Sequence, residues 1–300
     1  MEVTGISSHE TPSRLYKVAT DAAVSPGVRV TRAETSIGSV DLFQFADYRH
    51  AFPRHSHERL TIGVFGEGNG SIRFRNGAWN AMSGSILAIA ADETHSAEPL
   101  RGGGWTYRTF YPSDEFVRHA FGVVDSELKF TMPIIDDASL SQRLLHLHVA
   151  LEQRAPTLEI EVRIIDTFRQ VGRQYGCADG AKRVKSAPDS IARARSFIDV
   201  NFCRAISLTE LSAVAELSPF HFVRSFRKTV GIPPHAYLTQ ARANRARDLL
   251  LTGETVSGTA FRCGFSDQSH LTRVFKRIFG ITPGAYVSGV AGRAGRRSTV

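Results

Sequence analysis

The spacing of apolar residues changes once along the chain, near Pro112. Before it, residues 28–111 contain apolar runs of four to seven residues separated by glycine-rich turns. The runs cover residues 40–45, 60–65, 71–74, 85–89 and 105–111, and the turns cover residues 66–70, 76–77 and 83–84. Many short strands with regular turns are typical of a small β-barrel or sandwich. We therefore predict a β domain in this part of the chain.

Beyond Pro112 apolar residues recur every three or four positions, as on one face of a helix. These residues are Leu140, Leu144, Leu147 and Leu151 within 136–154, and Leu158, Val162, Ile165, Phe168 and Val171 within 157–175. The pattern predicts two amphipathic helices. Two interpretations stay open: the helices form a dimer interface, or they pack on the β domain.

Residues 176–188, rich in small and charged side chains, predict a linker. We assign residues 1–175 to an N-terminal domain, residues 189–288 to an all-α C-terminal domain, and residues 289–300 to a basic disordered tail. The expected fold class is a multidomain α+β protein, in which a β-barrel with following helices precedes an all-α domain.

The C-terminal domain contains an internal repeat. Residues 221–238 align without a gap with residues 270–287, at an offset of 49, and eight of the eighteen positions are identical. In each copy a basic amphipathic helix ends at a glycine, Gly231 or Gly280. Two copies of such a helix indicate a duplicated nucleic-acid-binding unit.

Capping signals place each repeated helix in a helix-turn-helix unit. Ser207 and Glu210 form a capping box that opens a short helix. After a turn, Ser218 is the predicted N-cap of the next helix, with Pro219 at its first position. In the second copy we predict Ser266 as the N-cap. A helix, a short turn and a second helix form a motif that enters the DNA major groove.

Helical geometry divides each predicted recognition helix into a buried apolar face and an outer face. The outer faces carry Phe220, Arg224 and Lys228 in the first copy, and Ser269, Arg273 and Arg277 in the second. Arg224 and Arg273 occupy equivalent positions, and an arginine there can bind guanine with about 1–3 kcal/mol of discrimination. We therefore predict that both arginines contact bases.

Residues 234–251 predict a helix that joins the two units. Its length of about 27 Å is close to the ~34 Å of one DNA turn, so the units could enter successive major grooves. Arg242, Arg245 and Arg247 lie on or near this helix, either as phosphate contacts or as solvated charges.

The positive charge lies entirely in the repeated part of the chain. Residues 1–188 contain 21 Lys and Arg against 22 Asp and Glu, a net charge of −1, whereas residues 189–300 contain 16 against 7, a net charge of +9. This asymmetry is the electrostatic signature of a polyphosphate partner and favours double-stranded DNA.

Residues 191–287 resemble the DNA-binding domain of AraC/XylS-type transcriptional regulators. The matching stretches are residues 208–215, 217–228, 233–250 and 264–286. The resemblance implies a seven-helix domain with two helix-turn-helix units. It also implies base contacts from Phe220, Val223 and Arg224 in the first unit, and from Gln268, Ser269, Thr272 and Arg273 in the second. Val223 stands where a polar residue is frequent, so this position favours an apolar base contact.

The N-terminal domain carries two closely spaced histidines, His55 and His57, and a third, His95. On an extended segment the first two share one face, and three neutral imidazoles can bind Zn²⁺, Fe²⁺ or Ni²⁺. The pattern resembles a cupin-like sensory barrel. A metal-dependent cupin has a glutamate four or five positions after the histidine pair, where this chain has Thr61 and Ile62.

We therefore expect no metal and no other cofactor, and keep metal binding open as an alternative. The histidines are predicted to line a pocket for a small organic effector, or to form hydrogen bonds within the barrel. Trp105, Tyr107 and Arg108 are further candidates for this pocket, because aromatic walls with a cation suit a small carboxylate, although the two aromatic residues could equally be barrel core.

Composition narrows the remaining function classes. No apolar run approaches the ~18 residues of a membrane span, and three cysteines without metal-like spacing suit a reduced, cytoplasmic protein. We predict a sequence-specific transcriptional regulator, not an enzyme, that forms a homodimer, responds to a small molecule and has RNA polymerase as a possible partner. The alternatives are a cupin metalloenzyme fused to a DNA-binding domain, and a ligand-independent DNA-binding dimer.

Overall fold

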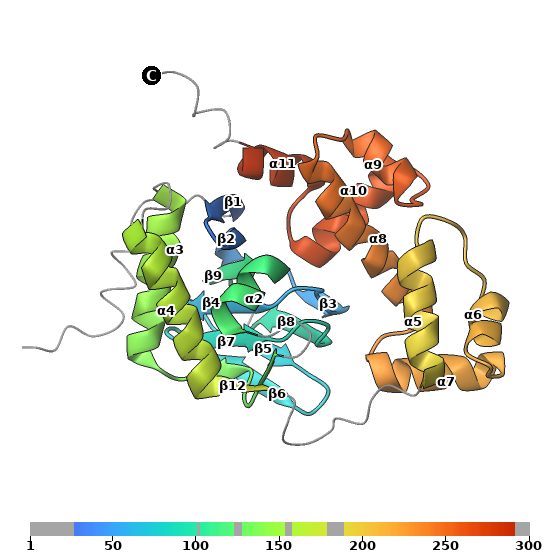
Figure 1. Ribbon diagram of the computed structural model, residues 1–300, viewed down its shortest axis with the longest axis horizontal. Coiled ribbons are helices and arrows are strands. Elements are labelled where there is room, and N and C mark those ends of the chain that lie inside the picture. Colours follow the sequence, from blue (N-terminus) through green and yellow to red (C-terminus); the bar gives the residue numbers. More distant parts are fainter. Residues whose placement is uncertain (1–26, 101–102, 123–127, 154–157, 179–188, 292–300) are drawn as a thin grey trace, which may run out of the picture.

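The computed structural model describes residues 27–100, 103–122, 128–153, 158–178 and 189–291. These residues form a β-rich N-terminal domain and a helical C-terminal domain, which lie side by side (Figure 1). The predicted fold class is confirmed. Residues 179–188 and 292–300, which include most of the predicted linker and tail, lie outside the described residues, so these parts of the two assignments stay predictions. Residues 289–291, which were assigned to the disordered tail, are helical instead.

Two of the three antiparallel sheets among the described residues form the barrel of the N-terminal domain. The larger sheet has the strand order β1-β2-β9-β4-β7-β11 and the smaller sheet the order β3-β8-β5-β6. The strands of the larger sheet are β1 (Gly27–Thr35), β2 (Gly38–Tyr48), β4 (Thr61–Phe65), β7 (Ile86–Ile89), β9 (Trp105–Pro112) and β11 (Ile134–Ile135). Those of the smaller sheet are β3 (Phe52–His55), β5 (Gly70–Arg73), β6 (Ala78–Ala81) and β8 (His95–Pro99). All five apolar runs in the sequence therefore form strands.

Three helices of the N-terminal domain, α2 (Asp114–Phe121), α3 (Ala138–Gln153) and α4 (Leu158–Tyr175), cover the larger sheet (Figure 1). Leu144 of α3 and Phe168 of α4 are fully buried in one core with Ile62 of β4. The two long predicted helices are confirmed, and their inner faces pack on the β domain. Leu158 and Val162 lie outside this core, with exposed fractions of 79% and 49%.

The first residues of the predicted linker form a short strand. β10 (Leu128–Phe130) pairs antiparallel with β12 (Gly176–Ala178). The first three residues assigned to the linker therefore belong to the N-terminal domain.

The described residues 189–291 form seven helices, the number that the family resemblance implies. They are α5 (Asp189–Asn201), α6 (Leu208–Val214), α7 (Pro219–Val230), α8 (Pro234–Leu251), α9 (Val256–Arg262), α10 (Gln268–Phe279) and α11 (Pro283–Ala291). The long helix α8 has the predicted bounds and connects the α6–α7 pair with the α9–α10 pair (Figure 1).

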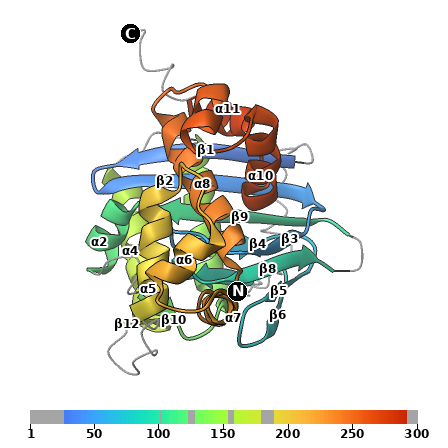
Figure 2. The same cartoon turned by 90° about the vertical axis from the view of Figure 1, so that its right-hand side faces the viewer.

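The two domains share a hydrophobic core. Phe43 and Phe45 of β2 belong to the same buried cluster as Leu250 of α8, Phe275 of α10 and Tyr286 of α11. Figure 2 shows α10 and α11 lying against the strands of the barrel. No helix of the described residues is both long and apolar enough to cross a membrane.

Candidate nucleic-acid interface and ligand pocket

The first recognition helix, α7, begins and ends as its sequence predicts. The Ser218 side chain accepts a hydrogen bond from the His221 backbone N–H, and Pro219 occupies the first turn. Gly231 ends the helix in the left-handed conformation, with φ of 93°. Phe222 and Phe226 are fully buried, which directs the opposite face to solvent.

The second recognition helix, α10, begins one residue later than expected. Asp267 is its N-cap and accepts the His270 backbone N–H at 2.7 Å. Ser266 instead donates its hydroxyl to the Asp267 carboxylate at 2.9 Å. The prediction of Ser266 as N-cap was wrong, because a carboxylate at the next position forms the stronger cap at a positive helix end. Gly280 ends the helix with φ of 76°.

The predicted DNA-contacting residues reach solvent on both helices. Seven are exposed and two, Val223 and Thr272, are half-buried; the exposed residues are Phe220, Arg224, Lys228, Gln268, Ser269, Arg273 and Arg277. Phe220 has an exposed fraction of 77%, which is unusual for an aromatic ring and is consistent with a contact surface. Base contacts from these nine residues stay a prediction.

The recognition helices are not parallel in this structure. α7 runs across the view in Figure 1 and is seen nearly end-on in Figure 2, whereas Figure 2 shows α10 from the side. Two helices that enter successive major grooves on one face of a straight duplex have to lie close to parallel. The orientation of α7 and α10 in this structure therefore differs from the one needed to place both helices in successive major grooves of straight DNA.

The arginines of α8 have different environments, so they are not equivalent phosphate contacts. Arg245 is exposed, and Arg242 donates to the carbonyl oxygens of Phe202 and Arg204 at 2.8 Å each. Arg247 is only 5% exposed and lines a cavity in the barrel. The interpretation of Arg247 as a phosphate contact or a solvated charge is therefore wrong.

The cavity lies between the barrel and the C-terminal domain. The space inside it that the centre of a water-sized sphere can reach is about 50 Å³, and the whole space between its lining atoms, open solvent at the mouth included, is about 710 Å³. Its walls are mainly aromatic and aliphatic side chains of the barrel. His55, His57, His95, Trp105 and Tyr107 all line it, so the structure brings together five of the six predicted ligand residues.

Arg108 does not line this cavity. Neighbouring residues on a strand point to opposite faces, so Arg108 of β9 points away from the cavity that Tyr107 and Thr109 line. It forms a buried ion pair with Glu152 of α3 and also contacts His148 Nδ1 at 3.2 Å. The grouping of Arg108 with the cavity residues is corrected accordingly.

Burial governs the ionisation of the three cavity histidines. Desolvation lowers the pKa of His55 to about 4 and that of His95 to about 3, and lowers that of His57 well below its usual value. The three imidazoles are therefore neutral at neutral pH. Burial also raises the pKa of the Tyr107 phenol well above its ordinary value, so this hydroxyl stays protonated.

The C-terminal domain supplies cavity residues that the sequence did not reveal. Arg247 of α8, and Ile278 and Phe279 at the end of α10, close one side of the cavity. Asp41 and Tyr111 of the barrel also line it. Alternation along β9 after Trp105 and Tyr107 predicts Tyr111, but the contribution of a second domain has no local signal in the sequence.

Both recognition helices end against the barrel. Thr94 donates its hydroxyl to the Val230 carbonyl of α7 at 2.6 Å, and Tyr48 donates its hydroxyl to the Gly280 carbonyl after α10 at 2.9 Å. A Cβ atom at Gly231 or Gly280 would lie 2.8 Å from the same hydroxyl oxygens. The close approach and the positive φ both require glycine at these two positions.

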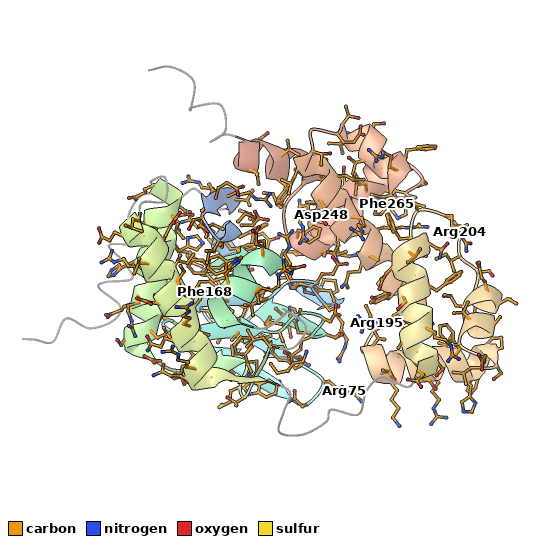
Figure 3. All side chains as sticks on the ribbon, viewed as in Figure 1. Arg75, Phe168, Arg195, Arg204, Asp248 and Phe265 are labelled. Atoms are coloured by element: carbon orange, nitrogen blue, oxygen red, sulfur yellow. The ribbon has the colours of Figure 1, made fainter. Side chains whose placement is uncertain are left out.

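Charged pairs and an amide complete the domain interface. Arg195 of α5 points toward the barrel and forms an ion pair with Asp92 at 2.6 Å (Figure 3). Asp248 of α8 forms a second ion pair, with Arg59 of the barrel, at 3.6 Å. The side chain of Gln240, which is buried, bonds to both the backbone and the hydroxyl of Ser56.

Two protein-family models match the chain. The AraC-like ligand binding domain matches residues 39–167, and a helix-turn-helix domain matches residues 211–289, so that together they cover more than half of the chain. The chain belongs to the AraC family of transcriptional regulators. The first match runs from β2 into α4 and leaves out β1, and the second spans both recognition helices.

Relatives of this AraC-family chain are similar over most of its length. The uncharacterized HTH-type transcriptional regulator YbfI of Bacillus subtilis is 26% identical over 77% of the chain and 86% of its own length. The HTH-type transcriptional activator RhaS of Klebsiella pneumoniae is 25% identical over 78% of the chain and 86% of its own length. These relatives are transcriptional regulators and not enzymes by name.

Solved structures of ToxT from Vibrio cholerae share the fold of this AraC-family chain. The apo form of a ToxT variant covers 86% of the chain and 99% of its own length, with a TM-score of 0.56 and 13% identity. A second ToxT structure, with unsaturated fatty acid bound, has a TM-score of 0.51 and 13% identity over 88% of the chain and 95% of its own length.

Proposed function

We propose that this regulator binds an amphipathic small molecule in the cavity between its domains, and that the bound molecule controls how the recognition helices meet DNA. One observation carries the proposal: residues of α8 and α10, helices of the DNA-binding domain, form a wall of the cavity in the sensory domain. A ligand there contacts both domains at once and stabilises the arrangement in which they are docked.

The cavity indicates the chemistry of this effector. Its walls are mostly apolar, which suits a hydrocarbon or aromatic body. The Nε–H group of Arg247 and the indole N–H of Trp105 are buried and have no hydrogen-bond partner among the described residues. Because an unpartnered buried donor costs about 1–3 kcal/mol, an acceptor oxygen on the ligand would relieve that cost. We infer a ligand with an apolar body and a carboxylate or carbonyl group. The fatty acid bound to ToxT belongs to this class.

The experiment compares ligand and DNA binding of the full chain in three forms. A library of small amphipathic carboxylates is screened by thermal shift, and hits are tested for their effect on DNA affinity by fluorescence anisotropy. Arg247→Met removes the buried guanidinium, and Arg245→Met, an exposed arginine two positions away on α8, is the matched control. We expect Arg247→Met to abolish the response and Arg245→Met to retain it. Equal responses from the two variants, or no compound that changes DNA affinity, would contradict the proposal.

Two finer features belong to the same proposal. We propose a homodimer, in which the exposed Leu158 and Val162 of α4 lie at or near the contact, and sedimentation of the full chain checks its mass. We also propose that the protein acts in the cytoplasm, where it has access to DNA, with RNA polymerase as a partner once it is bound to a promoter.

A further inference from the structure

Three histidine rings, two from the paired strands β3 and β8 and one from the segment just after β3, lie together in the cavity wall. His55 and His95 are direct partners in the register of β3 and β8, and His57 follows two residues after His55. Side chains two apart on an extended chain share a face. The ring centroids lie 4.5–4.8 Å apart, and the candidate ligand nitrogens all lie within 4.8 Å of one another.

The backbone fixes the tautomers of two of these rings. His55 Nδ1 lies 2.7 Å from the Pro53 carbonyl, and His95 Nδ1 lies 3.0 Å from the Glu93 carbonyl. A carbonyl oxygen only accepts hydrogen bonds, so both Nδ1 atoms carry the proton. Each neutral ring therefore presents its Nε2 lone pair. This is the arrangement in which an outer hydrogen bond orients a metal-binding histidine.

The third ring completes a set of nitrogen ligands. His57 Nε2 lies 3.3 Å from His95 Nε2. Nitrogens bound to one metal at about 2.1 Å lie roughly 3.0–3.4 Å apart in octahedral or tetrahedral geometry, so this pair already has the required separation. The widest separation, up to 4.8 Å, closes if one ring moves inward by roughly an ångström. His57 also has to transfer its proton from Nε2 to Nδ1.

We propose that His55, His57 and His95 bind one divalent transition metal, whose remaining coordination positions face the cavity. Three imidazoles without a carboxylate leave such a metal open to water or to a ligand oxygen. The positive charge of nearby Arg247 is offset by Asp41, Glu58 and Asp248.

The site is tested on the full chain, without DNA and without effector, so its outcome is independent of the proposed function. After chelator treatment, Zn²⁺ binding is measured by calorimetry for the native protein and for two variants. His57→Asn changes the partly exposed member of the trio, and His146→Asn makes the same substitution at an exposed histidine of α3. We expect one equivalent of Zn²⁺ in the native protein, the same affinity in His146→Asn, and at least tenfold weaker binding in His57→Asn.

Zinc-edge X-ray absorption of the loaded native protein provides a second measurement that does not depend on the folding of a variant. We expect outer-shell scattering from three imidazoles. Absence of stoichiometric Zn²⁺ binding, equal affinity in native protein and His57→Asn, or scattering from fewer than two imidazoles would each overturn the site. In those cases the three rings form only a hydrogen-bonded part of the cavity wall.

Discussion

Replacing Tyr286 with phenylalanine isolates one bond across the domain interface. The Tyr286 hydroxyl donates to Asp41 Oδ2 at 3.1 Å, and both residues are buried. The Tyr286 ring also lies 5.7 Å from that of Phe275 and 6.3 Å from that of Phe43, contacts that phenylalanine retains. Tyr286→Phe therefore removes a hydrogen bond between α11 and β2 with little change in packing.

The expected size of this effect follows from what remains at Asp41. A hydrogen bond to a charged group contributes about 1.5–3 kcal/mol. Asp41 keeps two bonds from Arg32, at 2.5 and 2.9 Å, so its carboxylate is not left without a partner. We therefore expect the lower end, about 1.5 kcal/mol of docking free energy, which is roughly a tenfold rise in the undocked population.

Hydrogen exchange measures that population, because undocking exposes the face of α11 that lies against β1. We expect α11 amides to exchange about tenfold faster in Tyr286→Phe. The matched control is Tyr175→Phe, whose hydroxyl donates to Asp137 at 3.0 Å within the N-terminal domain. The control should leave exchange in α11 unchanged. If both variants exchange alike, the bond between Tyr286 and Asp41 does not hold the domains together.

Three further predictions concern DNA recognition, pH and the cavity. Arg224→Ala and Arg273→Ala should each weaken binding by about 1–3 kcal/mol at its own half of the site, as measured by footprinting on mutated half-sites; unchanged selectivity in both would show that the outer faces do not contact bases. Glu152→Gln should destabilise the N-terminal domain by about 3–5 kcal/mol in urea unfolding, because Arg108 is left buried without a negatively charged partner. Burial raises the pKa of Glu152, but hydrogen bonds and charge interactions with His148 and Arg108 outweigh burial and lower this pKa to about 2. The ion pair therefore contributes fully to the free energy of unfolding above about pH 4.5, and this contribution disappears as the pH falls toward 2. Phe279→Ala should weaken effector binding in calorimetry while DNA affinity without effector stays within a few-fold, and unchanged effector affinity would place the ligand elsewhere.

Local signals predict the two repeated helices, and the register of the repeat also predicts their caps. The offset of 49 that aligns the two copies also relates Ser218 to Asp267 and Gly231 to Gly280. Applied to the caps, this offset gives the observed N-cap of α10 directly. Ser266 is one residue away from this register, and Asp267, at the matched position and with a carboxylate, is the N-cap.

The cavity was only partly predictable. Alternation along β9 separates Trp105, Tyr107 and Tyr111 from Arg108, so the side of the sheet that Arg108 occupies was available from the strand pattern. The burial of Arg247 was not, because α8 alone has a polar face there and only docking against the barrel covers it. Contacts between domains have no periodic signature in either sequence segment.

The position of α10 leads to a reciprocal prediction for effector and DNA. Its outer face is predicted to contact bases, while Phe279 at its end lines the cavity, so ligand and DNA act on the same helix. A ligand that contacts both domains favours the docked arrangement, in which α7 and α10 are not parallel, whereas a straight duplex with two successive contacts favours parallel helices. Effector and DNA should therefore weaken each other's binding by the same factor, since coupling between two sites is reciprocal. Calorimetric titration of effector into the protein, with and without a saturating DNA site, measures that factor. Tighter effector binding in the presence of DNA would show instead that the docked arrangement is the one that binds DNA.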